Sequence, residues 1–167
     1  AGDTTIKGTL DVVIDGKVYD IKSASKHAFK KFAHPDGFKK IEEDDPFGYV
    51  EQGFLYAAAK GIPFGGWIAY NKETGDIAVC NAPDSSIQKT KALRKAEKNI
   101  DALVKDKPFK RQFNKVPEKF RNKITGNYTI SLNCRYCNFL NSCWGNEIVY
   151  RKNPRGATHK WYFGEPK

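Results

Sequence analysis

The sequence lacks the features that mark several common protein classes. It contains no apolar run approaching the length of about 20 residues that a membrane-spanning helix requires. It has no secretory signal-peptide pattern, internal repeat or low-complexity segment. Its four cysteines do not have the spacing of a secreted disulfide framework, which favours a reducing, cytoplasmic location. It also has no methionine and begins with alanine, which indicates a processed or truncated N-terminus.

The composition favours a globular protein with a polyanionic partner. Of 167 residues, 40% are apolar and 13% are aromatic, which predicts one domain with a hydrophobic core rather than a disordered chain. Lysine and arginine number 29 against 19 aspartates and glutamates, which gives a formal net charge of +10. This excess suits nucleic acid first and an acidic membrane second, although the same charge can serve solubility alone.

Residues 8–22 predict a hairpin with two facing carboxylates. The dipeptide Asp15-Gly16 lies between two β-rich segments and favours a two-residue type I′ turn. The resulting pairs are Ile14 with Lys17, Val13 with Val18, Val12 with Tyr19, and Asp11 with Asp20. The last pair would place two like charges with Cβ atoms roughly 5 Å apart, a repulsion that a divalent cation between them would remove. Lys22 would point to the same face as Asp20. The alternative is an exposed hairpin with scattered charges.

Three motifs occur in an order that is typical of one nuclease superfamily. They are Gly8-x-x-Asp11, Asp20-Ile21-Lys22 and Gln52-x-x-x-Tyr56. With these motifs the chain resembles the PD-(D/E)XK nucleases, and among them the RecB-like exonucleases, over residues 8–144. The resemblance implies an α/β fold of the restriction-endonuclease type, with a mixed central sheet flanked by helices. It also implies one nuclease domain over residues 1–167.

The resemblance further implies a metal-dependent deoxyribonuclease, with an exonuclease of recombination or repair favoured, in a bacterial or phage-infected cytoplasm. The implied catalytic residues are Asp11, Asp20, Lys22, Gln52 and Tyr56, and the implied ligands of Mg²⁺ or Mn²⁺ are Asp11, Asp20 and the backbone carbonyl of Ile21. Lys22 would orient or help to deprotonate the attacking water. Gln52 and Tyr56 would hold the DNA strand or the catalytic groups in place. The expected partner is DNA, either single-stranded or at its ends.

Three thiols lie close together in a segment at residues 128–150. Their pattern, Cys134-x-x-Cys137-x5-Cys143, allows them to share one metal ion or cluster. It resembles the cysteine cluster of RecB-like nucleases with an iron–sulfur centre, which implies a 4Fe–4S cluster, with zinc as the alternative. A fourth ligand is needed, and Cys80 and His159 are the candidates.

One family feature is missing. Family members usually have a helix before the first motif that supplies a glutamate or histidine to the site, whereas here the chain begins seven residues before Gly8. His34 is a candidate for the missing role. Besides DNA, a protein partner in recombination or a missing N-terminal segment is an expected partner. Because a site without this ligand can be inactive, a non-catalytic nucleic-acid-binding module with a metal-stapled C-terminus is one alternative. A structure-specific endonuclease that cuts nicks or flaps is another.

Capping and periodicity predict further elements. Asp45-Pro46 favours the start of a helix that reaches about Lys60, with Tyr49, Gln52 and Tyr56 on one face. A second hairpin is expected over residues 64–71 and 76–81, followed by a helix from Ser85 to about Lys105.

Two basic segments are expected to contact nucleic acid. Residues 23–46 predict a basic loop beside the site, with a short helix within Ser23 to Ala33. Residues 105–123 carry eight basic and two acidic side chains, with Phe109, Phe113 and Phe120 among them, which suits a path for a single strand. In the basic tail, the aromatic side chains of residues 161–163 are expected to be available for docking.

Overall fold

The computed structural model describes residues 5, 7–107 and 110–167, and the chain divides into two compact units. The N-terminal unit comprises residues 1–108 and the C-terminal unit residues 109–167. Each unit has its own sheet and its own hydrophobic core. The chain therefore differs from the single domain expected from its length, because the strands of the C-terminal unit pair with one another and bury their own apolar side chains.

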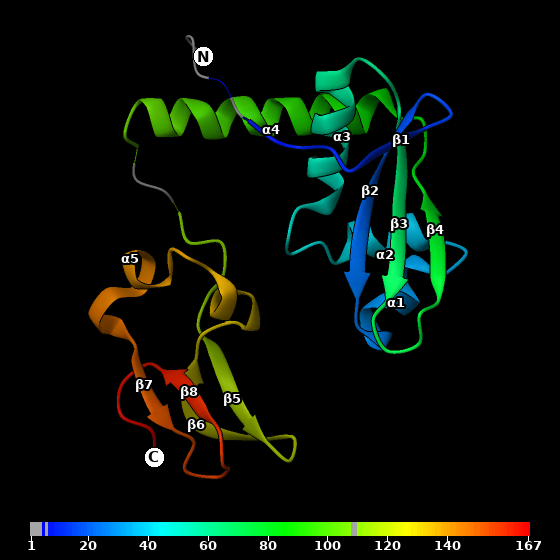
Figure 1. Ribbon diagram of the computed structural model, residues 1–167. Helices are drawn as coiled ribbons and strands as arrows, with labels where there is room; N and C mark the ends of the chain where they lie inside the picture. The colour runs from blue at the N-terminus through cyan, green and yellow to red at the C-terminus, as the bar shows by residue number, and fades with distance from the viewer. Residues whose placement is uncertain (1–4, 6, 108–109) are drawn as a thin grey trace. The chain divides into compact units, whose positions relative to one another are not determined.

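A mixed four-stranded sheet forms the centre of the N-terminal unit. Its strands are β1 (Val12–Ile14), β2 (Lys17–Ala24), β3 (Phe64–Asn71) and β4 (Ile77–Asn81), and they lie in that order (Figure 1). β2 and β3 are parallel, and the two outer pairs are antiparallel. The predicted β1–β2 register is confirmed from Ile14 with Lys17 to Val12 with Tyr19. Both turn residues have positive φ, 48° at Asp15 and 71° at Gly16, as a type I′ turn requires.

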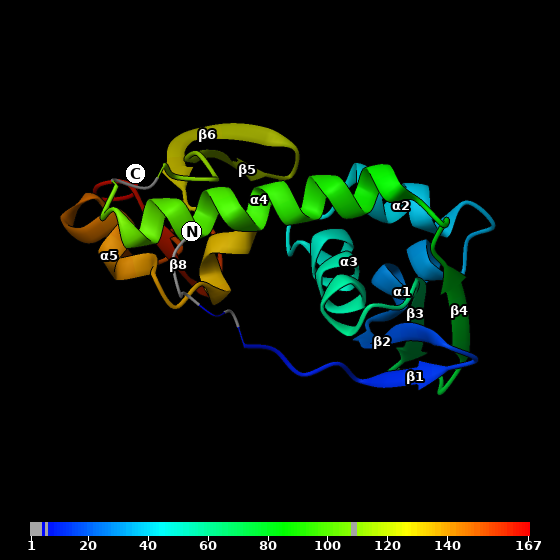
Figure 2. The ribbon, with the colours of Figure 1, turned by 90° about the horizontal axis from the view of Figure 1, so that it is seen from above.

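Four helices complete the N-terminal unit. They are α1 (Lys26–Phe32), α2 (Gly37–Glu43), α3 (Tyr49–Lys60) and α4 (Ser86–Val104). Figure 2 shows α1, α2 and α3 on one side of the sheet, with α4 packed against α3. The sequence predicts α3 from Asp45, but the helix begins four residues later. The Asp45 carboxylate accepts the backbone N–H groups of Tyr49 and Val50, each at 2.8 Å, so it still satisfies the first turn.

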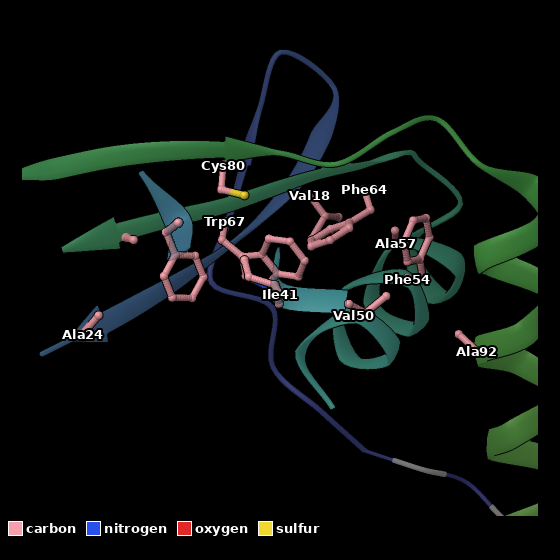
Figure 3. Close-up of a cluster of buried hydrophobic side chains, with 12 residues drawn as sticks. Val18, Ala24, Ile41, Val50, Phe54, Ala57, Phe64, Trp67, Cys80 and Ala92 are labelled. Carbon is pink, nitrogen blue, oxygen red and sulfur yellow. The ribbon is translucent and has the colours of Figure 1, made fainter. Parts of the chain in front are cut away.

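The core lies between the sheet and the helices, and Trp67 on β3 is its centre (Figure 3). Its side chain is fully buried. The Phe64 ring meets it edge-on with 5.2 Å between ring centroids, and the Phe38 ring stacks on it at 5.7 Å. Such aromatic pairs add roughly 0.5–1.5 kcal/mol each beyond the area they bury. This packing fixes β2, next to β3, against the helices.

The C-terminal unit is a second sheet covered by short helices. Its strands β5 (Val116–Phe120), β6 (Lys123–Thr129), β8 (His159–Tyr162) and β7 (Val149–Lys152) lie in that order. The helical turns are η1 (Leu132–Tyr136), α5 (Leu140–Trp144) and η2 (Gly145–Glu147). The small core consists of Ile130, Cys134, Leu140, Trp144 and Ile148.

Two expectations for the C-terminal residues change. Tyr162 is fully buried, and Trp161 and Phe163 pack against the small core, so these aromatic rings hold the unit together rather than standing free for docking. Phe113 also packs against this core, whereas Phe120 is 38% exposed and Phe109 lies outside the described residues. In the described part of the chain, none of the helices is long and apolar enough to cross a bilayer.

Candidate active site

The inner face of β2 carries an ion pair between Asp20 and Lys22. Alternate residues of a strand point to one face, so Asp20 and Lys22 follow the buried Val18 toward the helices. The Lys22 Nζ atom lies 2.7 Å from Oδ2 of Asp20. Asp20 is only 4% exposed. A buried carboxylate therefore has one positive neighbour, the Lys22 ammonium.

Asp11 lies just before β1 and contacts the backbone of β2. Its Oδ2 atom accepts the backbone N–H of Ile21 at 2.7 Å. In a strand the N–H and C=O of one residue point to the same edge, so the Ile21 carbonyl also faces the Asp11 side. The β1–β2 ladder ends at the pair Val12–Tyr19, and no strand partner pairs with Ile21 on this edge in the described residues. The carbonyl oxygen is thus directed toward the same place as the Asp11 carboxylate.

Helix α3 brings Gln52 and Tyr56 to the β2 side chains. Lys22 Nζ donates to Oε1 of Gln52 at 3.0 Å, and the Gln52 amide nitrogen donates to the Tyr56 hydroxyl at 3.2 Å. A Cβ atom on Gly8 would lie 2.6 Å from the Tyr56 ring, so only glycine allows the N-terminal segment to pass this close. The structure thus brings together residues from all three motifs.

Tyr49 is a neighbour of Lys22 whose role the sequence did not reveal. Lys22 Nζ lies 4.3 Å from the centroid of the Tyr49 ring, within the range of a cation–π contact. The spacing of Tyr49 and Gln52, three residues apart on α3, was the available signal. Lys22 is therefore held on three sides, by a carboxylate, an amide oxygen and an aromatic ring.

The pKa of Asp20 is raised above its ordinary value of 3.8. Burial of the carboxylate is the main cause, and the nearby charge of Asp11 adds to it. The hydrogen bond and positive charge of Lys22 act in the opposite direction. The negative charge of Asp11 is thus near enough to disfavour ionisation of Asp20.

This arrangement fits a hard divalent cation. The donors present are two carboxylates and a backbone carbonyl, all oxygens, which suits Mg²⁺ or Mn²⁺. Among the described residues, no three histidine, cysteine, aspartate or glutamate side chains lie close enough to hold one ion. A pair of carboxylates fits Mg²⁺ in particular, because this ion usually keeps several waters and takes its remaining ligands from substrate phosphates.

His34 does not join the carboxylate pair. It lies in the turn between α1 and α2, where its Nδ1 atom accepts the backbone N–H of Asp36 at 3.0 Å. It belongs to no group of metal-binding side chains within the described residues. The structure therefore does not support His34 in the role of the family's missing glutamate or histidine.

The thiols of Cys134, Cys137 and Cys143 lie near one another in the C-terminal unit but do not form a metal site as placed. Burial raises the pKa of the Cys134 thiol, and the charges of Cys137 and Cys143 raise it further. Cys137 is exposed, and in the described residues these thiols do not form a group able to hold one ion. Cys80 is buried in the core of the N-terminal unit, where burial raises its pKa to about 11, and this environment disfavours the thiolate that a ligand needs.

His159, the other candidate for a fourth ligand, lies on β8 with its ring stacked on Tyr150 at 5.4 Å between ring centroids. It is exposed, and no group of three cysteine, acidic or histidine side chains that includes it is found in the described residues.

Comparisons with known proteins add no relative to this description. No protein-family model matches the chain. No curated protein and no solved structure matches it either. The geometry of its own residues is therefore the basis for assigning a function.

Proposed function

We propose that the N-terminal unit is a metal-dependent deoxyribonuclease, with Asp11, Asp20 and Lys22 at its active site. One observation carries this proposal: Lys22 Nζ lies 2.7 Å from the Asp20 carboxylate and 3.0 Å from Gln52 Oε1. Residues of separate motifs, distant in the sequence, thus share one set of polar contacts. A purely structural strand would not need to bury the Asp20 carboxylate beside a partly buried lysine, because burying charges is costly.

Asp11, Asp20 and the backbone carbonyl of Ile21 are the groups that would hold Mg²⁺ or Mn²⁺. When bound, such an ion lowers the pKa of a water molecule and neutralises charge on the phosphate. Two carboxylates and the carbonyl of Ile21, which no strand pairs on that edge in the described residues, supply the oxygen atoms for it.

Lys22 and its neighbours position the reacting groups. Its ammonium group carries the positive charge that would stabilise a phosphate, and its three contacts fix where that charge lies. Gln52 holds Lys22 through its oxygen and Tyr56 through its nitrogen, so it links the lysine to the tyrosine hydroxyl. A DNA strand passing over this face would meet the Tyr56 hydroxyl and the Lys22 ammonium together.

DNA is the proposed substrate because of the charge of the chain. Twenty-nine basic against 19 acidic residues suit a polyanion, and two facing carboxylates need a metal ion before a phosphate can approach. An exonuclease acting in the cytoplasm on single strands or DNA ends is the form that the motifs favour. An endonuclease that cuts nicks or flaps would use the same groups.

The test is digestion of end-labelled linear DNA beside closed circular DNA, with Mg²⁺ or Mn²⁺ and with a chelator. We expect metal-dependent release of nucleotides from the linear substrate and little cutting of the circle. Lys22→Met should reduce the rate by about 10²- to 10⁴-fold, as for loss of a proton-transferring or charge-stabilising group. The matched control is Lys17→Met, which removes an exposed lysine from the same strand and should leave the rate unchanged.

Each result separates the candidate functions. Binding of DNA without any metal-dependent cleavage would contradict the nuclease proposal and favour a non-catalytic binding module. Equal cutting of the circular substrate would favour the endonuclease. Equal loss in Lys17→Met and Lys22→Met would contradict the specific role of Lys22.

Bound iron or zinc at Cys134, Cys137 and Cys143 is a second prediction, which rests on the spacing of the thiols in the sequence, since in the described residues they do not form a group able to hold one ion. The three thiols lie within ten residues of the sequence. Elemental analysis of protein prepared without oxygen is expected to find one of these metals, with a 4Fe–4S cluster giving visible absorption. Cys137→Ser should lose the metal, whereas Cys80→Ser, in the other unit, should keep it. Finding no iron or zinc above background in the wild-type protein would contradict this prediction.

A further inference from the structure

The β5–β6 hairpin of the C-terminal unit has an exposed face of mixed aromatic, aliphatic and basic side chains. Pro117 pairs with Tyr128 and Lys119 pairs with Ile124, so residues of these two pairs line one face. Tyr128 is 41% exposed and Ile124 is 68% exposed. The hairpin lies at the edge of the sheet, and Arg121 and Asn122 form its tight turn with φ of 46° and 64° (Figure 1).

Each exposed ring of this hairpin has a cation beside it. Lys115 Nζ lies 4.8 Å from the centroid of the Tyr128 ring, and the Arg121 guanidinium lies 5.4 Å from that of Phe120. Phe120 is 38% exposed at the end of β5, next to the turn. The two rings lie on opposite faces of the hairpin, because Phe120 lies two residues after Glu118 along β5, on the same face as that acid, whereas Tyr128 pairs with Pro117. Tyr128, with the Lys115 ammonium close to it, therefore belongs to the exposed face described above.

The charges exposed on the hairpin have one sign. Residues 115–129 contain four basic residues, which are Lys115, Lys119, Arg121 and Lys123, and one acid, Glu118. Glu118 is 3% exposed and points to the opposite face, where it accepts hydrogen bonds from Lys160 and Tyr162 at 3.0 and 2.9 Å. The buried acid is thus neutralised within the unit, and the exposed face keeps its full positive charge.

We propose that this hairpin binds single-stranded nucleic acid on the face that carries Tyr128, with a base stacking on that ring and phosphates contacting the neighbouring lysines and Arg121 of the turn. Rings and cations side by side match a single strand, whose unpaired bases expose their flat faces beside charged phosphates. A duplex hides those faces, and an acidic membrane is better matched by an amphipathic helix. The inference extends the proposed function. It rests on that function for one statement, that the bound single strand is the substrate that is cleaved.

Binding is measured with the full chain in a chelator, so that no cleavage takes place. The probe is a short fluorescent oligothymidylate, followed by anisotropy over a range of salt concentrations. Tyr128→Ala is expected to weaken binding at least about fivefold, the loss for one stacked base. Tyr70→Ala is the matched control, because Tyr70 is 44% exposed on a strand of the other unit, and it should bind like wild type.

The charges are tested separately. For the double variant Lys119→Gln/Arg121→Gln, the slope of log affinity against log salt should decrease by about 1.4, or 0.7 for each phosphate that is no longer neutralised. Lys72→Gln, which removes an exposed lysine between β3 and β4, should leave the slope unchanged. If Tyr128→Ala lowers the melting temperature, Tyr128→Leu, which keeps an apolar side chain without a ring, provides the same comparison.

The inference is overturned if both Tyr128 variants bind like wild type, if duplex DNA binds more tightly than the single strand, or if anionic phospholipid vesicles compete for the same residues more strongly than DNA. Its failure is distinct from failure of the proposed nuclease. If Tyr128→Ala binds the oligonucleotide like wild type and still cleaves DNA, only the hairpin proposal is contradicted. If wild-type protein binds the oligonucleotide in a way that depends on salt and on Tyr128 but does not cleave DNA, only the nuclease proposal is contradicted.

Discussion

Replacing Asp20 with asparagine is expected to abolish metal-dependent DNA cleavage while leaving the metal-free protein as stable as wild type or more stable. An asparagine side chain at this position would offer the ion no charge, so the proposed site would lose a ligand and the attacking water would no longer be activated. Because Asp20 is buried near Asp11, its ionised form destabilises the folded protein. Asparagine carries no charge and removes this destabilisation. Nuclease assays and thermal melting of the same preparations measure the two effects.

The pH dependence of this variant follows from the direction of the Asp20 pKa shift. The folded protein holds a proton on Asp20 more tightly than the unfolded chain, whose pKa is near 3.8. Stability from this group is therefore fully present below about pH 3.8 and is lost as the pH rises through the higher folded value. The gain in melting temperature of Asp20→Asn should accordingly appear at neutral pH and disappear in acid.

Asp15→Asn is the matched control for the same charge change. Asp15 is exposed in the turn of the same hairpin, and Asn-Gly is also a favoured type I′ pair, so cleavage should be unaffected. A structural role for Asp20 would produce the reverse pattern: lower stability of Asp20→Asn with no selective loss of cleavage. Undiminished DNA cleavage by Asp20→Asn would contradict the proposal that Asp20 belongs to an active site.

Glu118→Ala is expected to destabilise the C-terminal unit by about 3–5 kcal/mol, the usual cost of removing one partner of a buried ion pair. The Glu118 carboxylate accepts hydrogen bonds from four side chains, those of Thr125, Asn127, Lys160 and Tyr162. Without it, the Lys160 ammonium and the Tyr162 hydroxyl lose a buried acceptor. Hydrogen exchange should show lost protection in β5, β6 and β8 with little change in β3.

Glu165→Ala provides the control for an acid of the same unit. Glu165 pairs with Arg151 at 2.8 Å, but its side chain is 69% exposed, so its removal should cost at most about 1 kcal/mol. An effect of Glu118→Ala as small as that of Glu165→Ala would contradict the importance assigned to the buried network.

Acid should weaken the same unit. Burial alone would raise the pKa of Glu118, but the hydrogen bonds from Asn127, Lys160, Thr125 and Tyr162 lower it from 4.5 to about 2. The folded protein thus binds this proton less tightly than the unfolded chain. Stability from Glu118 is present above about pH 4.5 and lost as the pH falls toward 2. Glu118→Gln should show a flatter stability profile over this range.

Most elements of the N-terminal unit could be predicted from the sequence, because the residues that determine their turns and ends are close to them in the chain. Asp15-Gly16 fixes the turn and hence the register that follows, and Gly61 ends α3 in the left-handed conformation with φ of 74°. Ser85 caps α4 through its side chain, which accepts the backbone N–H of Gln88 at 3.2 Å. The start of α3 was missed because Asp45 reaches its first turn from outside the helix.

The C-terminal unit was not predicted because its strands are short and their partners are distant. β5 contains Pro117, and β7 and β8 are four residues each with no sustained alternation of apolar residues. What joins β5 and β6 to β8 is a buried acid, Glu118, and a hydrophobic pattern does not reveal such a group.

The residues of the candidate site could be predicted from the sequence, but the contacts between their side chains could not. The spacing of β2 placed Lys22 beside Asp20, yet only the fold shows that Tyr49 and Gln52 of α3 also reach this lysine. The register predicted Asp11 opposite Asp20, but not that the Asp11 carboxylate accepts the backbone N–H of Ile21. Contacts of this kind depend on how α3 and the N-terminal segment pack, which local sequence does not determine.

The central claim is that Asp11 and Asp20 hold one divalent cation together. Its most direct test is titration with Mn²⁺ followed by electron paramagnetic resonance, since Mn²⁺ prefers oxygen ligands and should avoid the thiols. Wild type is expected to bind Mn²⁺, Asp11→Asn and Asp20→Asn to bind it much more weakly, and Asp15→Asn to bind it like wild type. Lys22→Met should bind it at least as tightly as wild type, because the ammonium 2.7 Å from Asp20 competes with the ion. Equal Mn²⁺ binding by wild type and Asp20→Asn would contradict the claim.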